Sequence, residues 1–172
     1  MFRNALNHKN CTIFRLTVAA AAVCLSLFVF AGCSLLKTVK DQLSSSNIPD
    51  GYTKKEEHWD TWGFQDATDY CKYFYENAEP FENDPDFSRV TSGDIENLSE
   101  YFDDFQQWVA ASGWLEEVYD FNTDCITNGD YFLIKTLEGK PIGDSYYEKF
   151  DNYSVYFFDT ETCILYYIHN NI

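Results

Sequence analysis

Residues 153–169 read YSVYFFDTETCILYYIH, two runs of aromatic and aliphatic residues joined by a polar link. Such runs favour β-strands, because aromatic and β-branched side chains pack well on a pleated, half-buried surface. The link at 159–162 has the length of a short hairpin loop. We therefore predict a β-hairpin with arms at 153–158 and 163–169.

A second hairpin is expected directly upstream of the first. Residues 119–125 alternate apolar and polar side chains, the period of a strand with one buried face. Asn128 and Gly129 form the dipeptide preferred in two-residue hairpin turns, and 131–137 supplies the partner strand. Together the two hairpins predict an antiparallel sheet of about four strands.

Helices are predicted before these strands. Apolar residues recur at steps of three and four across 64–78 and across 95–109, so each segment places them on one helical face. Thr91 to Asp94 fit a capping box, and Gly113 fits a helix end. This order predicts an α+β fold with two N-terminal helices packed on the sheet. At fold level it is similar to a cystatin-like or NTF2-like arrangement, an analogy that implies no function.

Composition limits both the number of domains and the class of partner. The chain has 172 residues, with 12 basic against 28 acidic side chains and a net charge of −16. A nucleic-acid partner is not expected, because phosphate neutralisation needs a Lys/Arg surface. The serines at 44–46 and the turn residues at 49–51 indicate a flexible linker. We therefore place one folded domain at 52–172.

The N-terminal segment has the layout of an export signal. Residues 1–15 contain basic side chains and no acidic ones, and residues 16–36 are uncharged and mostly apolar. Small residues then precede a cysteine, as expected for a secretory signal peptide. The stretch Phe30-Ala31-Gly32-Cys33 resembles the lipobox of bacterial prolipoproteins, whose usual form is Leu-Ala/Ser-Gly/Ala-Cys; Phe30 stands where leucine is more common.

This resemblance implies that residues 1–32 are removed as a signal peptide and that Cys33 is acylated with diacylglycerol and fatty-acid chains such as palmitate. It also implies that 33–51 is a lipid anchor and tether, and that the protein lies on the extracytoplasmic side of the cell membrane. Two or more acyl chains are what stable anchoring requires. The alternative is an uncleaved transmembrane anchor at 16–36, long enough to cross a bilayer of about 30 Å.

The remaining cysteines suggest one disulfide at most. Cys71, Cys125 and Cys163 follow the lipobox, and an exported protein can oxidise them. The sequence leaves the pairings 71–125, 71–163 and 125–163 open. Cys71 lies on the apolar stripe of the first predicted helix, which also fits a buried thiol.

Motifs for metal binding and catalysis are incomplete. Asp120, Asn122 and Asp124 match the first EF-hand ligands, but Cys125 stands at the required glycine and Tyr131 at the final glutamate. No zinc-ligand spacing, nucleophile elbow, Walker loop or dinucleotide fingerprint occurs. The sequence therefore predicts no metal, no cofactor and no catalytic residue.

Aromatic residues, 19% of the chain, are the main candidates for a binding surface. Neighbouring residues in a strand point to opposite faces, so Tyr166 and Tyr167 cannot both enter one core. Displayed Tyr and Trp suit recognition of glycans or protein surfaces, whereas cross-strand aromatic pairs are the structural alternative. The candidate surface consists of Trp59, Trp62, Tyr156, Tyr166 and Tyr167.

These features predict a lipid-anchored protein whose domain binds a ligand or a protein without catalysis. A small cell-envelope hydrolase using paired carboxylates is the alternative, and it requires acids that converge in one pocket. The pairs Asp103/Asp104 and Glu116/Glu117 read best as solvated charges. A structural envelope protein without a small ligand is a third hypothesis, favoured by a packed core without a pocket.

Overall fold

A computed structural model describes residues 47–60 and 67–171. Residues Ile48–Ile172 group into one compact unit, the folded domain. The predicted signal peptide, the lipobox with Cys33, most of the tether, and Trp62 lie outside the described residues. Within the described ranges, no helix is both long enough and apolar enough to cross a membrane.

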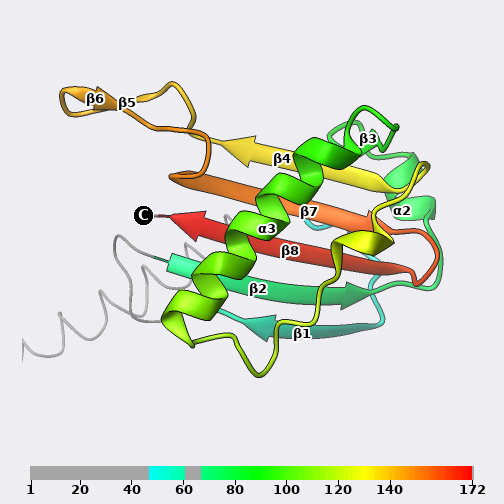
Figure 1. The fold of residues 1–172 in the computed structure, drawn as a ribbon. Helices are drawn as coiled ribbons and strands as arrows, with labels where there is room; N and C mark the ends of the chain where they lie inside the picture. The colour runs from blue at the N-terminus through cyan, green and yellow to red at the C-terminus, as the bar shows by residue number, and fades with distance from the viewer. Residues whose placement is uncertain (1–46, 61–66, 172) are drawn as a thin grey trace, which may run out of the picture. The chain divides into compact units, whose positions relative to one another are not determined.

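The domain is built on a six-stranded sheet in which every neighbouring pair is antiparallel (Figure 1). The strands, in spatial order, are β1 (Lys54–His58), β2 (Ala67–Phe74), β8 (Ile164–Asn171), β7 (Asn152–Asp159), β4 (Tyr131–Thr136) and β3 (Ser88–Arg89). A separate hairpin pairs β5 (Pro141–Ile142) with β6 (Ser145–Tyr146). The predicted α+β class with an antiparallel sheet is confirmed, as is the hairpin that became β7 and β8, but the prediction of about four strands is wrong because the sheet has six.

Helix α3 (Ile95–Ser112) lies across one face of the sheet (Figure 1). It begins where the Asp94 carboxylate accepts hydrogen bonds from the Thr91 amide and hydroxyl, at 2.9 and 2.6 Å. It ends at Gly113, whose φ of 67° is the left-handed conformation that closes helices. The predicted second helix is therefore confirmed. Its buried residues are Leu98, Tyr101, Phe102, Phe105 and Val109.

The predicted helix at 64–78 is wrong, because 67–74 form strand β2. This strand lies between β1 and β8, and both of its faces are covered; Tyr70 and Cys71 are neighbours, yet each is fully buried. A strand buried on both faces loses the alternation of polar and apolar residues. Apolar residues three and four positions apart can then occur in a strand, and they imitate the pattern of a helix.

The predicted strand at 119–125 is also wrong. Its end forms a short 3₁₀ turn, η1 (Thr123–Cys125), which the Asn122 side chain caps by accepting a hydrogen bond from the Asp124 amide at 3.0 Å. The turn at Asn128 and Gly129 is real, but it connects η1 to β4 instead of joining two strands. Local Asn side-chain bonding competes with strand pairing, which explains the difference.

The face of the sheet opposite α3 is partly covered by the connection between β2 and β3. This connection contains the short helix α2 (Glu79–Glu82), whose Phe81 stacks on Phe158 of β7 with ring centroids 3.9 Å apart. Phe87 packs in the same cluster. The sheet therefore has apolar residues packed on both faces, and among the described residues the long helix α3 covers one face alone.

Candidate functional site

Four polar side chains form a row across the face of the sheet opposite α3. Asp69 of β2 is paired with His169 of β8, His169 with Ser154 of β7, and Ser154 with Lys135 of β4. Directly opposed residues of antiparallel strands point to the same face, with Cβ atoms about 5 Å apart. We call Asp69, His169, Ser154 and Lys135 the polar row.

The contacts of His169 determine what chemistry the polar row can perform. His169 Nδ1 lies 2.8 Å from the Tyr153 carbonyl oxygen and 3.0 Å from Ser154 Oγ. A carbonyl oxygen only accepts, so this contact requires a proton on Nδ1. A protonated Nδ1 cannot take the hydroxyl proton of Ser154, as an activated serine nucleophile would need. The contact between His169 and Ser154 is therefore not a base–nucleophile pair. His169 Nδ1 is a hydrogen-bond donor.

The buried end of the polar row is Asp69. Its side chain is 0% exposed, and Oδ1 accepts a hydrogen bond from the Asp60 amide at 2.7 Å. Ser154 and His169 are half-buried, and Lys135 is exposed. The row thus runs from a buried carboxyl group to an exposed amine across four strands.

Aromatic residues lie one pleat along from the polar row. Tyr167 of β8 and Tyr156 of β7 are a directly opposed pair with ring centroids 4.8 Å apart, and they are 0% and 1% exposed. The half-buried Trp59 ring lies 5.6 Å from that of Tyr167. Three predicted binding residues therefore meet on this face. Tyr166 lies on the other face of the sheet, 4.9 Å from Phe121, and Trp62 is outside the described residues.

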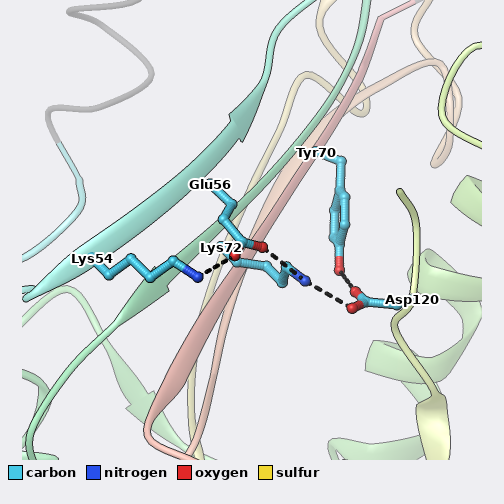
Figure 2. Close-up of polar contacts among 5 residues, drawn as sticks. All are labelled: Lys54, Glu56, Tyr70, Lys72 and Asp120. Carbon is cyan, nitrogen blue, oxygen red and sulfur yellow. Dashed lines mark hydrogen bonds and ion pairs between the residues drawn. The ribbon is translucent and has the colours of Figure 1, made fainter. Parts of the chain in front are cut away.

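A second polar cluster links β1, β2 and the segment before η1 (Figure 2). Lys72 Nζ lies 2.7 Å from Asp120 Oδ2 and 3.1 Å from Glu56 Oε2, while Lys54 Nζ contacts Glu56 Oε1 at 2.5 Å. The buried Tyr70 donates its hydroxyl proton to Asp120 Oδ1 at 2.6 Å. Burial alone would raise the pKa of Asp120, but the bonds from Lys72 and Tyr70 outweigh burial and lower it.

These contacts also explain the incomplete EF-hand pattern. Both carboxylate oxygens of Asp120 bond to protein side chains, and Asn122 caps η1 instead of pointing to a common centre with Asp124. Over the residues that the structure describes, no three His, Cys, Asp or Glu side chains come together as a metal site.

Among the predicted carboxylate pairs, only Asp104 has a distinctive environment. It is half-buried on α3, burial raises its pKa, and Tyr153 donates a hydrogen bond to its Oδ2 at 2.8 Å. Asp103, Glu116 and Glu117 are exposed. The raised pKa of Asp104 is the one feature of these four acids that a hydrolytic mechanism would use.

Cys71, Cys125 and Cys163 are free thiols in the structure. Cys71 pairs with Tyr167 of β8, and Cys163 lies just before β8, four residues from Tyr167. Four residues of extended chain correspond to about 13 Å, beyond the roughly 7 Å that a disulfide spans. Cys125 packs with the α3 cluster, whereas Cys71 belongs to the opposite face. Burial raises the pKa of the Cys71 thiol, and it raises that of Cys125 to about 12.

Register between distant strands, which sequence reasoning did not use, is what brings the polar row together. Asp69 and His169 are neighbours in the sheet although a hundred positions separate them. His169 and Ser154 belong to the predicted hairpin, so their pairing was within reach of the sequence. No family model, curated protein or solved structure matches this chain.

Proposed function

We propose that this protein is a membrane lipoprotein on the extracytoplasmic side of the membrane, held by an acylated Cys33, whose folded domain binds a ligand or a protein without catalysis. The observation that carries the binding part is the juxtaposition of the polar row with Trp59, Tyr156 and Tyr167. Binding sites combine apolar and aromatic surface with a few placed polar groups; on this face the half-buried Trp59 supplies the accessible ring, and the buried Tyr156 and Tyr167 support it from below.

The kind of ligand follows from the same side chains. A row that offers a half-buried imidazole, a half-buried hydroxyl and an exposed amine next to an indole suits hydroxyl-rich or peptide ligands. We therefore favour glycans and peptide segments over apolar metabolites. One helix over an antiparallel sheet resembles cystatin-like and NTF2-like arrangements, and we include that finer fold in the proposal as an analogy without functional weight.

Anchoring at Cys33 is supported by the sequence Ala31-Gly32-Cys33 after an uncharged segment. The folded unit starts at Ile48. A fully extended tether from Cys33 would reach about 50 Å, so the domain would work close to the membrane surface. The hydrolase alternative stays a prediction, favoured only by the raised pKa of Asp104.

The anchoring part is tested by labelling cells with a palmitate analogue and separating their membranes. We expect Cys33→Ala to abolish label incorporation and to release the protein from the membrane fraction. Cys24→Ala is the matched control, because it removes another cysteine of the same N-terminal segment and should change neither result. Label and membrane retention that survive Cys33→Ala would contradict the lipid anchor.

The binding part is tested by thermal unfolding of the full-length protein in detergent with glycans, short peptides and calcium. A ligand at a hundred times its Kd adds about 2.7 kcal/mol to the free energy of unfolding. A shift that Trp59→Ala removes and Trp114→Ala retains supports the proposed face. Trp114 is the control, because it is exposed and hydrogen-bonded to the Thr68 carbonyl, away from Tyr167. A shift lost with Trp114→Ala alone would place binding elsewhere.

A further inference from the structure

Strand β4 has an open edge. Its outer neighbour β3 pairs only with Tyr131 and Phe132. The chain then turns away, because the Phe87 amide bonds to the Asp84 carbonyl instead of continuing along β4. Among the described residues, no strand pairs with the outer side of 133–136.

The peptide groups that face this open edge can be identified from the alternation along β4. The Asp130 carbonyl bonds outward to the Val90 amide, whereas the Leu137 amide bonds inward to Asn152 next to β7. Peptide groups alternate in direction along a strand, so those of Ile134 and Thr136 point outward. Outward N–H and C=O groups at a sheet edge are a template for an added strand.

An exposed segment with apolar side chains, residues 137–146, follows the open edge, and we call it the arm. The β5–β6 hairpin extends beyond the end of β4 (Figure 1). Leu137, Ile142 and Tyr146 are 38%, 46% and 67% exposed, which is three of the five large apolar side chains exposed in the described residues. Single tyrosines in such positions are typical anchors of protein interfaces.

Charge distinguishes among the possible occupants. Two copies that paired about Lys135 would set their Lys135 side chains directly opposite each other, and two chains of net charge −16 would repel each other in any register. A lipid surface is disfavoured because Asp144 lies in the turn at the arm's tip, between the paired Ile142 and Ser145. The rest of the surface is strongly acidic, with a net charge of −16 for the chain. Around the edge and the arm, four acidic side chains, Glu138, Asp144, Glu148 and Asp151, stand against three lysines, Lys135, Lys140 and Lys149, so the attraction for a basic segment comes from the net charge of the whole chain.

We propose that a basic, extended polypeptide segment adds as an antiparallel strand to the outer edge of β4 at 133–136, with apolar contacts to the arm at Leu137, Ile142 and Tyr146. The inference rests on the proposed binding function and specifies a partner class and a second surface for it. Backbone hydrogen bonds to Ile134 and Thr136 would hold the segment, with an apolar residue of the segment opposite Lys135, and the net charge of −16 would favour a basic segment.

The test uses the full-length protein in detergent and an octapeptide that alternates lysine and isoleucine, with binding measured by calorimetry. Thr136→Pro removes an outward N–H, and proline is tolerated on an edge strand when its missing N–H faces outward. Thr136→Val is the matched control: both variants lose the hydroxyl bond to the Asn152 carbonyl, but Val keeps the N–H. A peptide N-methylated at every residue has no N–H group on either edge, and it provides a second control that leaves the protein unchanged.

We expect the octapeptide to bind, Thr136→Pro to weaken it roughly tenfold, and Thr136→Val to bind like the unsubstituted protein. The N-methylated peptide should not bind, and this comparison of peptides decides the test if Thr136→Pro does not fold. The inference is overturned if the octapeptide does not bind, if N-methylation has no effect, or if a glutamate–isoleucine octapeptide binds equally well. A thermal shift that depends on Trp59 would then leave the proposed function standing, whereas absence of both responses would remove both.

Discussion

Asp130 is fully buried, and its carboxylate joins two loops at one end of the sheet. Oδ2 accepts bonds from the Thr127 amide and hydroxyl at 2.8 and 3.0 Å, and Oδ1 from the Thr160 amide and hydroxyl at 2.9 and 2.8 Å. A buried charge of this kind is tolerated only when it is hydrogen-bonded. In the sequence Asp130 reads as an ordinary turn residue after Asn128 and Gly129, because its partner Thr160 lies in another loop.

Replacing Asp130 tests this role. Asp130→Ala leaves two amides and two hydroxyls without their acceptor, so we expect the free energy of unfolding to fall by about 3 kcal/mol in urea denaturation. Asp124→Ala removes an exposed acid nearby and should change it by less than about 0.5 kcal/mol. A loss for Asp130→Ala as small as that for Asp124→Ala would contradict the structural role of the buried carboxylate.

Asp120 makes stability depend on pH. Its pKa is lowered in the folded protein, so its ionised form contributes stability above the unfolded pKa of about 3.9, and this contribution is lost as pH falls through the folded pKa. Asp120→Asn keeps an acceptor for Tyr70 but removes the charge facing Lys72. Because the Asp120 side chain is 59% exposed, we expect a cost of only about 1 kcal/mol at pH 7.

The same comparison at low pH checks the sign. The difference between the unsubstituted protein and Asp120→Asn should shrink once pH falls below 4, in urea unfolding measured from pH 7 to 2. A difference that stays constant or grows toward low pH would mean that ionised Asp120 does not stabilise the fold.

At the scale of elements, strands proved harder to predict than the long helix. The segment that forms α3 carries a capping box, an apolar stripe and a terminal Gly113, and all three signals are local. Strand β2 was mistaken for a helix, since burial on both faces removed its alternation. Strand β1, KKEEH, offers no apolar pattern at all; its charges suit an edge strand that must not pair further.

Hydrogen exchange tests the order of stability among these elements. Amides of β7 and β8 at the centre of the sheet should exchange most slowly, because both strands are paired on each side. Amides of the β5–β6 arm should exchange close to the rate of unstructured peptides, since a short isolated hairpin is marginally stable. Protection of the arm equal to that of β8 would mean that it is packed against something other than its own strands.

At the scale of the whole molecule, sequence reasoning identified the class of fold and one hairpin, but not the meeting of distant residues. Tyr156 and Tyr167 could be selected as aromatic, yet which face they share with Trp59 depends on the order β2–β8–β7. Asp69 and Ser154 carried no motif, because their significance comes from register across three strands. Sheet order is set by global packing, which local periodicity does not encode.

The two faces and the outer edge of the sheet in the folded domain differ from one another. One face of the sheet packs under α3, the other carries the polar row and its aromatic neighbours, and the outer edge of β4 is open. An anchor at Cys33 would present these surfaces at the membrane, where an acidic domain is kept off anionic headgroups by repulsion. The lipid anchor is therefore the central claim, since it determines where any binding takes place.

Mass spectrometry of the N-terminal peptide from the native protein tests that claim most directly. The account predicts a peptide that begins at Cys33 and carries the added mass of diacylglycerol, with or without a further acyl chain. A peptide that begins at Met1, or one that contains an unmodified Cys33, would contradict the account.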